Sequence, residues 1–303
     1  MQVWKLSELE WGEDKMADTW READLRKEYI DSAVKAVNLD LAKLKTLCTI
    51  DKSDAWTESY YRETNADSAD GLTGSSIKGI PQMAPFPFVE VKETKVSSVV
   101  LKYGDESIIS LEMQQNATVP MLQRHILRMG RKTQWQIDAA VNAAMSANAG
   151  NTFAISAGHE WNSATLANRD PIYDILYGIN MLRADGIDAL NGNGYLVVNG
   201  TDYTNIISNS KILNHPTYQS VSAVENGVVA SLVGLKIMVS EAVTADQAYI
   251  VIKGEALVWK QAQAMQVVTI DDPGKSTLIR CWERGVVQVH SPNAICKITN
   301  TRV

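Results

Sequence analysis

A single long amphipathic helix, predicted over residues 118–148, most constrains how this chain can fold. Apolar residues recur there at helical spacing and would form one face: Val119, Leu122, Ile126, Met129, Ile137, Ala140, Val141 and Ala144. Asn116 or Thr118 can cap the start, Pro120 suits the first turn, and Gly150 is placed to end the helix. At the standard rise these residues form a rod of about 46 Å, which few compact domains of this size need.

The stretch before this helix reads as an extended loop with an apolar tip. Residues 65–79 are rich in Asn, Asp, Ser and Gly, and Ile80–Phe88 contains three prolines. Prolines at that density exclude a helix and a central strand. Phe86 and Phe88, two of the three phenylalanines of the chain, stand beside them. Because a long apolar loop cannot bury itself cheaply on its own domain, we expect it to reach over a partner.

The N-terminal segment carries the acidic excess of the chain. The formal net charge is −6, and residues 1–70 hold 10 Lys/Arg against 16 Asp/Glu, whereas residues 71–303 hold 19 of each. Residues 7–47 have helical periodicity, and Ser7 and Glu10 have the capping-box spacing. This acidic helix could lie on its own domain, or it could be an arm that docks on a neighbouring subunit or a scaffold. The sequence has no basic tail, so strong binding of phosphate groups is not expected.

Strands and shorter helices fill the remainder, which predicts the α+β class. Residues 95–103 and 106–113 are expected to pair as strands through a turn at Gly104-Asp105. A second helix is predicted from Pro171 to about Gly186, capped by Asp170 or Asn168, and a short helix at residues 201–208. Further strands are predicted at 195–199, 228–232, 235–240, 248–253, 255–260, 266–271, 278–283, 286–290 and 294–299.

Catalytic, cofactor and metal motifs are missing from the sequence. The four histidines are far apart, GxSxG does not occur, and the Gly-Lys-Ser within residues 272–276 lacks the upstream glycine of a P-loop, so a turn is expected there. The three cysteines do not form a disulfide framework. No signal peptide or membrane-spanning stretch is evident. The sequence therefore predicts no enzyme, no cofactor and no membrane partner.

The order of these segments resembles the major capsid protein of tailed double-stranded DNA viruses, either phages or their archaeal relatives, which has the HK97-like capsid fold. The resemblance covers roughly residues 50–303. It rests on the loop, the long helix, the Ser110-Leu111-Glu112 approach to that helix, Tyr195–Asn199, the hairpin Leu232–Ser240 and the closing Ser291–Ile295. It implies an N-terminal arm (1–64), an extended loop (65–94), a peripheral domain (95–165 and 272–303) with spine helix 118–148, and an axial domain (166–271).

The resemblance also implies a function. The chain would self-assemble into pentamers and hexamers that form an icosahedral shell around double-stranded DNA, in the host cytoplasm and then the virion. Only about sixty residues precede the loop, fewer than a built-in scaffold domain needs, so scaffolding is expected from a separate protein or from the short acidic helix. A separate portal protein is expected as well. Phe86 and Phe88 are the candidate anchors of the contact between subunits.

Arg124, Arg128 and Arg131 share one face of the long helix, because they are spaced i, i+4 and i+7. They could form a solvated face or pair with acidic loops. Alternatively, they could contact the acidic arm of a neighbour, or touch packaged DNA weakly and without sequence specificity. Two other functions remain open: an encapsulin-like cargo compartment with the same fold, and an unrelated α+β enzyme.

Overall fold

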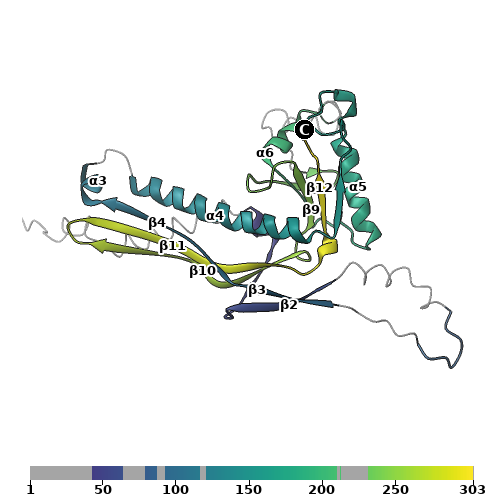
Figure 1. Ribbon diagram of the computed structural model, residues 1–303, viewed down its shortest axis with the longest axis horizontal. Helices are drawn as coiled ribbons and strands as arrows, with labels where there is room; N and C mark the ends of the chain where they lie inside the picture. Colours follow the sequence, from purple (N-terminus) through teal and green to yellow (C-terminus); the bar gives the residue numbers. More distant parts are fainter. Residues whose placement is uncertain are drawn as a thin grey trace, which may run out of the picture.

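The computed structural model describes residues 43–63, 79–86, 93–116, 121–209, 212 and 231–302. Four strands form an elongated sheet in the order β1-β10-β11-β4. Their bounds are β1 (Thr49–Lys52), β10 (Leu257–Asp272), β11 (Ser276–Val289) and β4 (Leu101–Ser110). Only β1 runs parallel to its neighbour, and β10 and β11 form the long hairpin seen in Figure 1.

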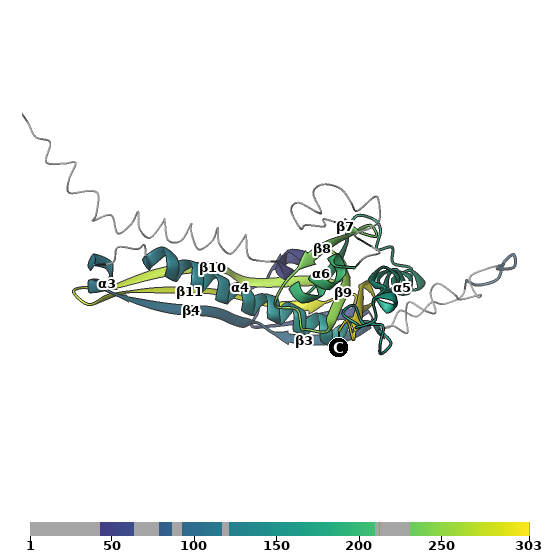
Figure 2. The same cartoon turned by 90° about the horizontal axis from the view of Figure 1, so that it is seen from above.

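Helix α4 (Met121–Asn148) lies along this sheet, with α3 (Leu111–Asn116) at the far end (Figures 1 and 2). Ile126 and Met129 of α4 pack on buried side chains of three strands: Ile109, Met265, Val267, Ile279 and Cys281. The helix is about 42 Å long and buries one apolar stripe, because its apolar residues recur every three or four positions. The outer face of α4 remains exposed.

A second sheet has six strands in the order β5-β12-β9-β6-β8-β7. Their bounds are β5 (Asn151–Ala154), β12 (Ile295–Thr299), β9 (Gln247–Ile252), β6 (Gly194–Val198), β8 (Leu235–Val239) and β7 (Ser231–Leu232). Helix α5 (Pro171–Ala184) packs on β12, β5 and β9, and α6 (Gly200–Ile207) follows β6. The larger core cluster lies here, with β9 buried almost throughout.

Two further strands form a separate hairpin, β2 (Thr57–Glu63) paired with β3 (Glu93–Val99). Residues 79–86 lie well clear of both sheets in Figure 1. Short 3-10 helices complete the described chain: η2 (Leu44–Leu47), η4 (Leu166–Asn168) and η5 (Pro292–Ala294). The hairpin therefore leads from the elongated sheet toward the predicted loop.

Several predicted elements are confirmed. The long helix runs as α4 to Asn148, although residues 117–120, with its predicted start, lie outside the described part. Asp170 caps α5, where its side chain accepts from the backbone of Tyr173, and Gly186 follows the end with a φ of 80°. The turn at residues 272–276 joins β10 to β11. The mixed class of helix and sheet is confirmed. The predicted helix 7–47 lies outside the described residues up to position 42.

The turn predicted at Gly104-Asp105 is wrong. Both residues lie inside β4, which pairs with β11 from Leu101 to Ser110, while Leu111 and Glu112 begin α3. Gly104 is needed there for space, because a Cβ atom would lie 2.6 Å from the carbonyl oxygen of Cys281. The interruption between strands lies instead at Val100, where β3 ends and β4 begins.

Four predicted strands are in fact two long ones. The segments 255–260 and 266–271 belong to β10, and 278–283 and 286–290 belong to β11. The register of β10 against β11 shifts between Gln261 and Gln263 and again between Gln263 and Gln266. These irregularities lie where the sequence pattern separates the predicted strands 255–260 and 266–271. The sheets also divide the chain differently from the predicted domains, since β5 and β12 join the six-stranded sheet while β10 joins the four-stranded one.

Candidate subunit-contact surfaces

The tip of the predicted loop is a compact apolar turn. Ala84 donates from its backbone to the carbonyl of Pro81 at 3.1 Å, and Met83 has a φ of 65°. The Met83 side chain is fully exposed and that of Phe86 is 83% exposed. Phe88 lies outside the described residues. An exposed aromatic ring and an exposed thioether in the same short turn suit a contact with another protein better than contact with water.

The hairpin that carries the loop is fastened by polar and aromatic contacts. Ser59 and Ser97 approach to 3.1 Å across the strands, and the Tyr60 ring lies 5.1 Å from that of His290. The guanidinium of Arg284 lies 5.3 Å from the ring of the exposed Trp56. These contacts tie the start of the hairpin to the end of β11, so the loop has a fixed base.

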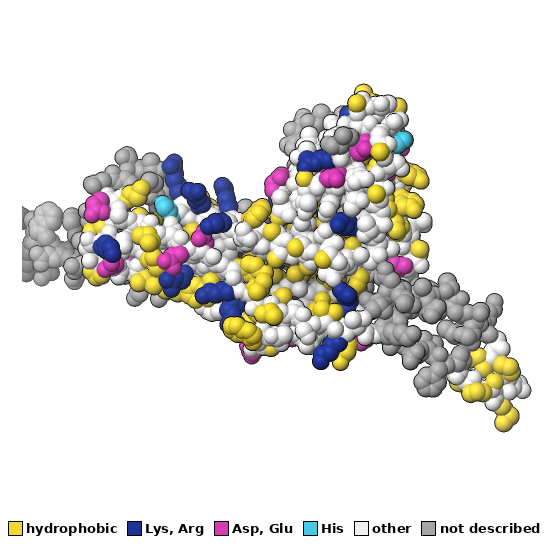
Figure 3. Space-filling view, viewed as in Figure 1, with side chains coloured by type: hydrophobic (Ala, Val, Ile, Leu, Met, Phe, Trp, Pro, Cys, Tyr) yellow, Lys and Arg dark blue, Asp and Glu magenta, His cyan; other side chains and the backbone are white. Residues whose placement is uncertain are grey.

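The three predicted arginines lie on the exposed side of α4. Arg124, Arg128 and Arg131 are all exposed, and no ion pair is found for them within the described residues. Figure 3 shows Lys and Arg side chains gathered over this helix. Neighbouring Lys132 pairs with Asp105 of β4 at 2.9 Å. The structure therefore brings the three together as one exposed basic row.

Sequence reasoning missed a buried polar cluster that anchors the N-terminal side of the chain. Asp138 of α4 accepts from the backbone amides of Lys43 at 3.3 Å and Lys45 at 3.2 Å, and from the Gln134 side chain. Burial raises the pKa of Asp138, although the hydrogen bonds it accepts oppose that shift. The carboxyl thus holds residues 43–48 against the long helix.

Glu283 of β11 completes this cluster. Its Oε1 receives the Lys45 ammonium as well as Trp259 Nε1 at 3.2 Å and Gln261 Nε2 at 2.9 Å. The Lys45 ammonium also lies 5.3 Å from the Trp259 ring. A glutamate within the apolar alternation of β11 was the signal in the sequence, since a buried charge needs a partner.

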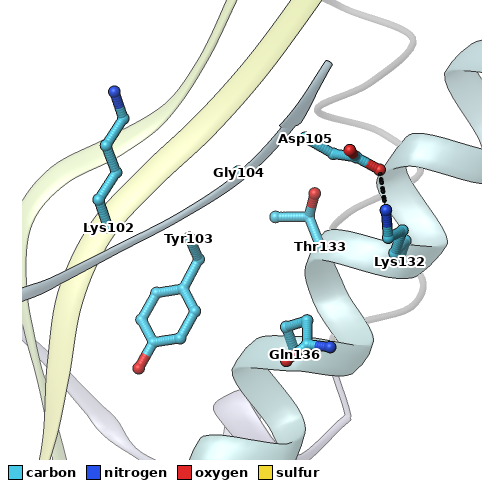
Figure 4. A pocket seen from close by; sticks show the side chains of 7 residues that line it. All are labelled: Lys102, Tyr103, Gly104, Asp105, Lys132, Thr133 and Gln136. Carbon is cyan, nitrogen blue, oxygen red and sulfur yellow. Dashed lines mark ion pairs between the residues drawn. The ribbon is translucent and has the colours of Figure 1, made fainter. Parts of the chain in front are cut away.

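A small hollow of about 200 Å³ lies between β4 and α4 (Figure 4). Its lining residues are Lys102, Tyr103, Gly104, Asp105, Lys132, Thr133 and Gln136. Asp105 and Lys132 reach toward each other from the two elements, while Lys102 points away from Tyr103. Burial acts to raise the pKa of Asp105, but hydrogen bonds from Lys132 and the Glu106 amide leave that pKa below its ordinary value. The pair therefore serves as a link between sheet and helix.

The sequence predicts no special role for the four histidines. Three of them lie in the part of the chain that the structure describes, and each of these has a close neighbour. His125 Nδ1 lies 2.6 Å from Ser107 Oγ, His159 Nδ1 lies 3.3 Å from the carbonyl of Asn168, and the His290 ring lies tilted against that of Tyr60. Within the described ranges no three acidic, histidine or cysteine side chains gather as a metal site. Among these same residues, no helix is both long and apolar enough to cross a membrane.

Comparison with known proteins supplies the family. The family model described as "Phage capsid protein" matches residues 93–298, which run from β3 into β12 and so include the six-stranded sheet and, apart from β1, the four-stranded one. No match was found among curated protein sequences.

Solved structures share the fold at low sequence identity. A virus-like particle from Pyrococcus furiosus matches with a TM-score of 0.61 and 10% identity, over 90% of this chain and 99% of that chain. The capsid of cyanophage P-SCSP1u matches with a TM-score of 0.64 and 11% identity, over 84% and 86%. The mature capsid of bacteriophage PhiM1 matches with a TM-score of 0.60 and 16% identity, over 86% and 87%.

Proposed function

This chain belongs to the phage capsid protein family and is a capsid shell protein, and we propose that its copies form the pentamers and hexamers of an icosahedral shell around double-stranded DNA. The observation that carries the proposal is the family match over residues 93–298. The HK97-like fold agrees with it, because the similar structures include assembled phage capsids. Location in the virion capsid follows from the family.

The two sheets suggest how the chain is divided into domains. We assign the four-stranded sheet with α4 to the peripheral domain and its spine helix, and the six-stranded sheet with α5 and α6 to the axial domain. On this assignment β10 is peripheral, whereas β5 and β12 are axial, which moves the boundaries expected at residues 166 and 271. The arm expected over residues 1–64 would be confined to residues before Lys43, because β1 pairs with β10 and β2 with β3.

The loop tip is the proposed anchor on a neighbouring subunit. Phe86 is exposed beside Met83, away from both sheets, and Phe88 follows two residues later. Aromatic side chains carry much of the energy of protein interfaces, because they bury large apolar area at low entropic cost. The contacts between Trp56 and Arg284 and between Tyr60 and His290 would hold the base of the loop while the tip binds.

The arginine row has two proposed partners. One is the acidic N-terminal arm of a neighbour, whose excess of carboxylates would pair with Arg124, Arg128 and Arg131. The other is packaged DNA, held weakly and without base recognition. Three exposed arginines on one helix suit either role. The contact with DNA would have to be weak, because strong binding to every phosphate would hinder packing of the genome.

Further partners are proposed from the shell role itself. A scaffolding protein and a portal protein would be separate chains, and assembly would take place in the host cytoplasm before DNA enters. The shell role requires no catalytic centre. A cargo compartment of the encapsulin type is not favoured by the family match.

Imaging of the purified protein tests the proposal. We expect closed shells by negative-stain electron microscopy, together with rings of five and six copies at low assembly yield. The matched control is the same protein in mild denaturant, where the rings should dissociate. A species that stays small under every assembly condition would favour the alternative α+β enzyme.

A further inference from the structure

Helix α5 presents an apolar row to solvent. Tyr173 is 63% exposed, Leu176 is 46% exposed and Tyr177 is 45% exposed, and their spacing places them on one side of the helix. The rings of Tyr173 and Tyr177 stack with centroids 6.4 Å apart. Figure 3 shows hydrophobic side chains along the edge of the molecule where α5 runs in Figure 1.

The opposite side of α5 packs against the core of its own subunit. Ile175, Ile179 and Leu182 are buried in the larger core. Gly178 lies so close to the sheet that a Cβ atom would stand 2.7 Å from Cδ1 of Ile250. Within its own subunit Tyr177 also meets Phe153 edge to face, with ring centroids 5.0 Å apart, but the outer side of the row stays exposed. Two tyrosines with a leucine have the composition of an interface centre.

The other face of the same sheet carries an aromatic and basic surface. Ile250 faces α5 and pairs in register with Leu196, so the next residue, Tyr195, points to the far side. The ammonium of Lys236 lies 5.5 Å from the centre of the Tyr195 ring, and that of Lys253 lies 6.0 Å from it. Both lysines are exposed. We name these three residues the Tyr195 surface.

The charges beside the two surfaces are opposite. Four carboxylates lie on or next to α5, against the two cations Arg169 and Arg183: Asp170, Asp174, Asp185 and Asp188. The Tyr195 surface contributes two ammonium groups. Each surface therefore complements the other in charge, while both offer aromatic rings to a partner.

Resting on the proposed function, we infer that the α5 row of one subunit docks on the Tyr195 surface of the next copy of this chain. The two surfaces lie on opposite faces of one sheet, so they cannot meet within a subunit. A contact between different surfaces of identical copies is heterologous, and its repetition closes a ring when the rotation allows. The six-stranded units would then stack face to back around the ring.

A charge swap tests this pairing in the full chain. Tyr173→Lys with Tyr177→Lys places two cations opposite Lys236 and Lys253, so the yield of rings and shells should fall about tenfold or more. Adding Lys236→Glu and Lys253→Glu to that variant should restore assembly, which repair of a folding defect would not explain. The matched control, Thr201→Lys with Thr204→Lys, puts the same charges on the exposed side of α6 and should assemble normally.

Either of two results overturns the inference while the wild type assembles. One is normal assembly by the Tyr173→Lys, Tyr177→Lys variant. The other is that the four-substitution variant, shown to be folded by circular dichroism, remains as defective as the double variant. If the wild type forms no particle at all, the proposed function fails instead, and cross-linking decides the inference.

For cross-linking, one protein carries Tyr177→Cys and another carries Lys236→Cys. The three native cysteines are buried, so they should not compete for a short bifunctional thiol reagent. We expect linked dimers in the mixture and few in either protein alone, because the contact joins different surfaces. A mixture that yields no more dimer than the separate proteins contradicts the pairing.

Discussion

The backbone amide of Lys45 donates to Oδ1 of Asp138 across 3.2 Å, joining the N-terminal side of the chain to the middle of the long helix. The amide of Lys43 reaches Oδ2 of the same carboxyl. One buried side chain thus holds residues 43–48 against α4, at the point from which the proposed N-terminal arm would depart.

Asp138→Ala is expected to loosen that attachment. It leaves two backbone N–H donors without their acceptor, at a cost of about 1–3 kcal/mol in the free energy of unfolding. Urea unfolding of the unassembled subunit measures the loss, and hydrogen exchange at residues 43–48 should rise. Asp138→Asn, which keeps one acceptor oxygen, should lose less. Equal stability of the alanine variant and the wild type would show that the cluster does not hold the segment.

The pH dependence of stability should report the same carboxyl. Burial raises the pKa of Asp138 above its ordinary value, so the folded chain holds this proton more tightly than the unfolded chain. Its contribution is therefore complete below a pH of about 4 and is lost as pH rises through the folded pKa. The advantage of the wild type over Asp138→Asn in unfolding free energy should be largest in acid. An advantage that grows with pH would contradict this sign.

Gly104→Ala should weaken the elongated sheet. The new methyl group would meet the backbone of Cys281 and Cβ of Trp282, at 2.6 and 2.8 Å, so β4 must shift away from β11. We expect a loss of about 1–3 kcal/mol by thermal or urea unfolding. Gly158→Ala is the comparison, because its site is open and only its φ of 85° resists a side chain. A smaller loss at Gly104 than at Gly158 would show that β4 can move freely.

Phe86→Ser with Phe88→Ser should leave the subunit folded and block particle formation. Phe86 is exposed, so its loss costs the isolated subunit little, whereas a shell contact would lose its aromatic anchors. Electron microscopy and size-exclusion chromatography measure the outcome, with circular dichroism as the folding check. Conservative replacement of both by Tyr should retain assembly. Normal shells from the serine variant would remove the loop tip from the account.

Replacing Arg124, Arg128 and Arg131 by Ala should change subunit stability by no more than about 0.5 kcal/mol, because all three are exposed. Assembly yield should fall and its dependence on salt should weaken, since the row would no longer contribute a screened attraction. Lys275→Ala, which removes an exposed cation at the β10–β11 turn, is the control. An unchanged salt dependence in the triple variant would show that the row is only a solvated surface.

Local patterns in the sequence predicted the elements that depend on local chemistry. The cap at Asp170, the periodicity of α4 and the turn at residues 272–276 are each set by a few neighbouring residues. The lengths of β4, β10 and β11 could not be predicted in this way. Gly104 is a turn-forming residue and residues 261–264 around Gln263 lack the large apolar residues of a strand, and only pairing with a distant strand keeps both extended.

The buried cluster was beyond local reasoning for the same reason. Lys45 and Glu283 are 238 positions apart, so no spacing rule connects them. The exposure of Tyr173 and Leu176 was equally hidden, because helical periodicity gives a face for apolar residues but not whether a second apolar side remains uncovered. Phe86 was found from its proline-rich setting, and its exposure agrees with that reading.

The most direct test of the account is an electron cryomicroscopy map of shells assembled from the wild-type chain. The central claim is that the apolar loop tip of each copy rests on another copy. We expect side chains of a neighbouring subunit within about 4 Å of Met83 and Phe86 around every ring. A map in which that tip folds onto its own subunit, or projects into solvent without a neighbour, would contradict the claim.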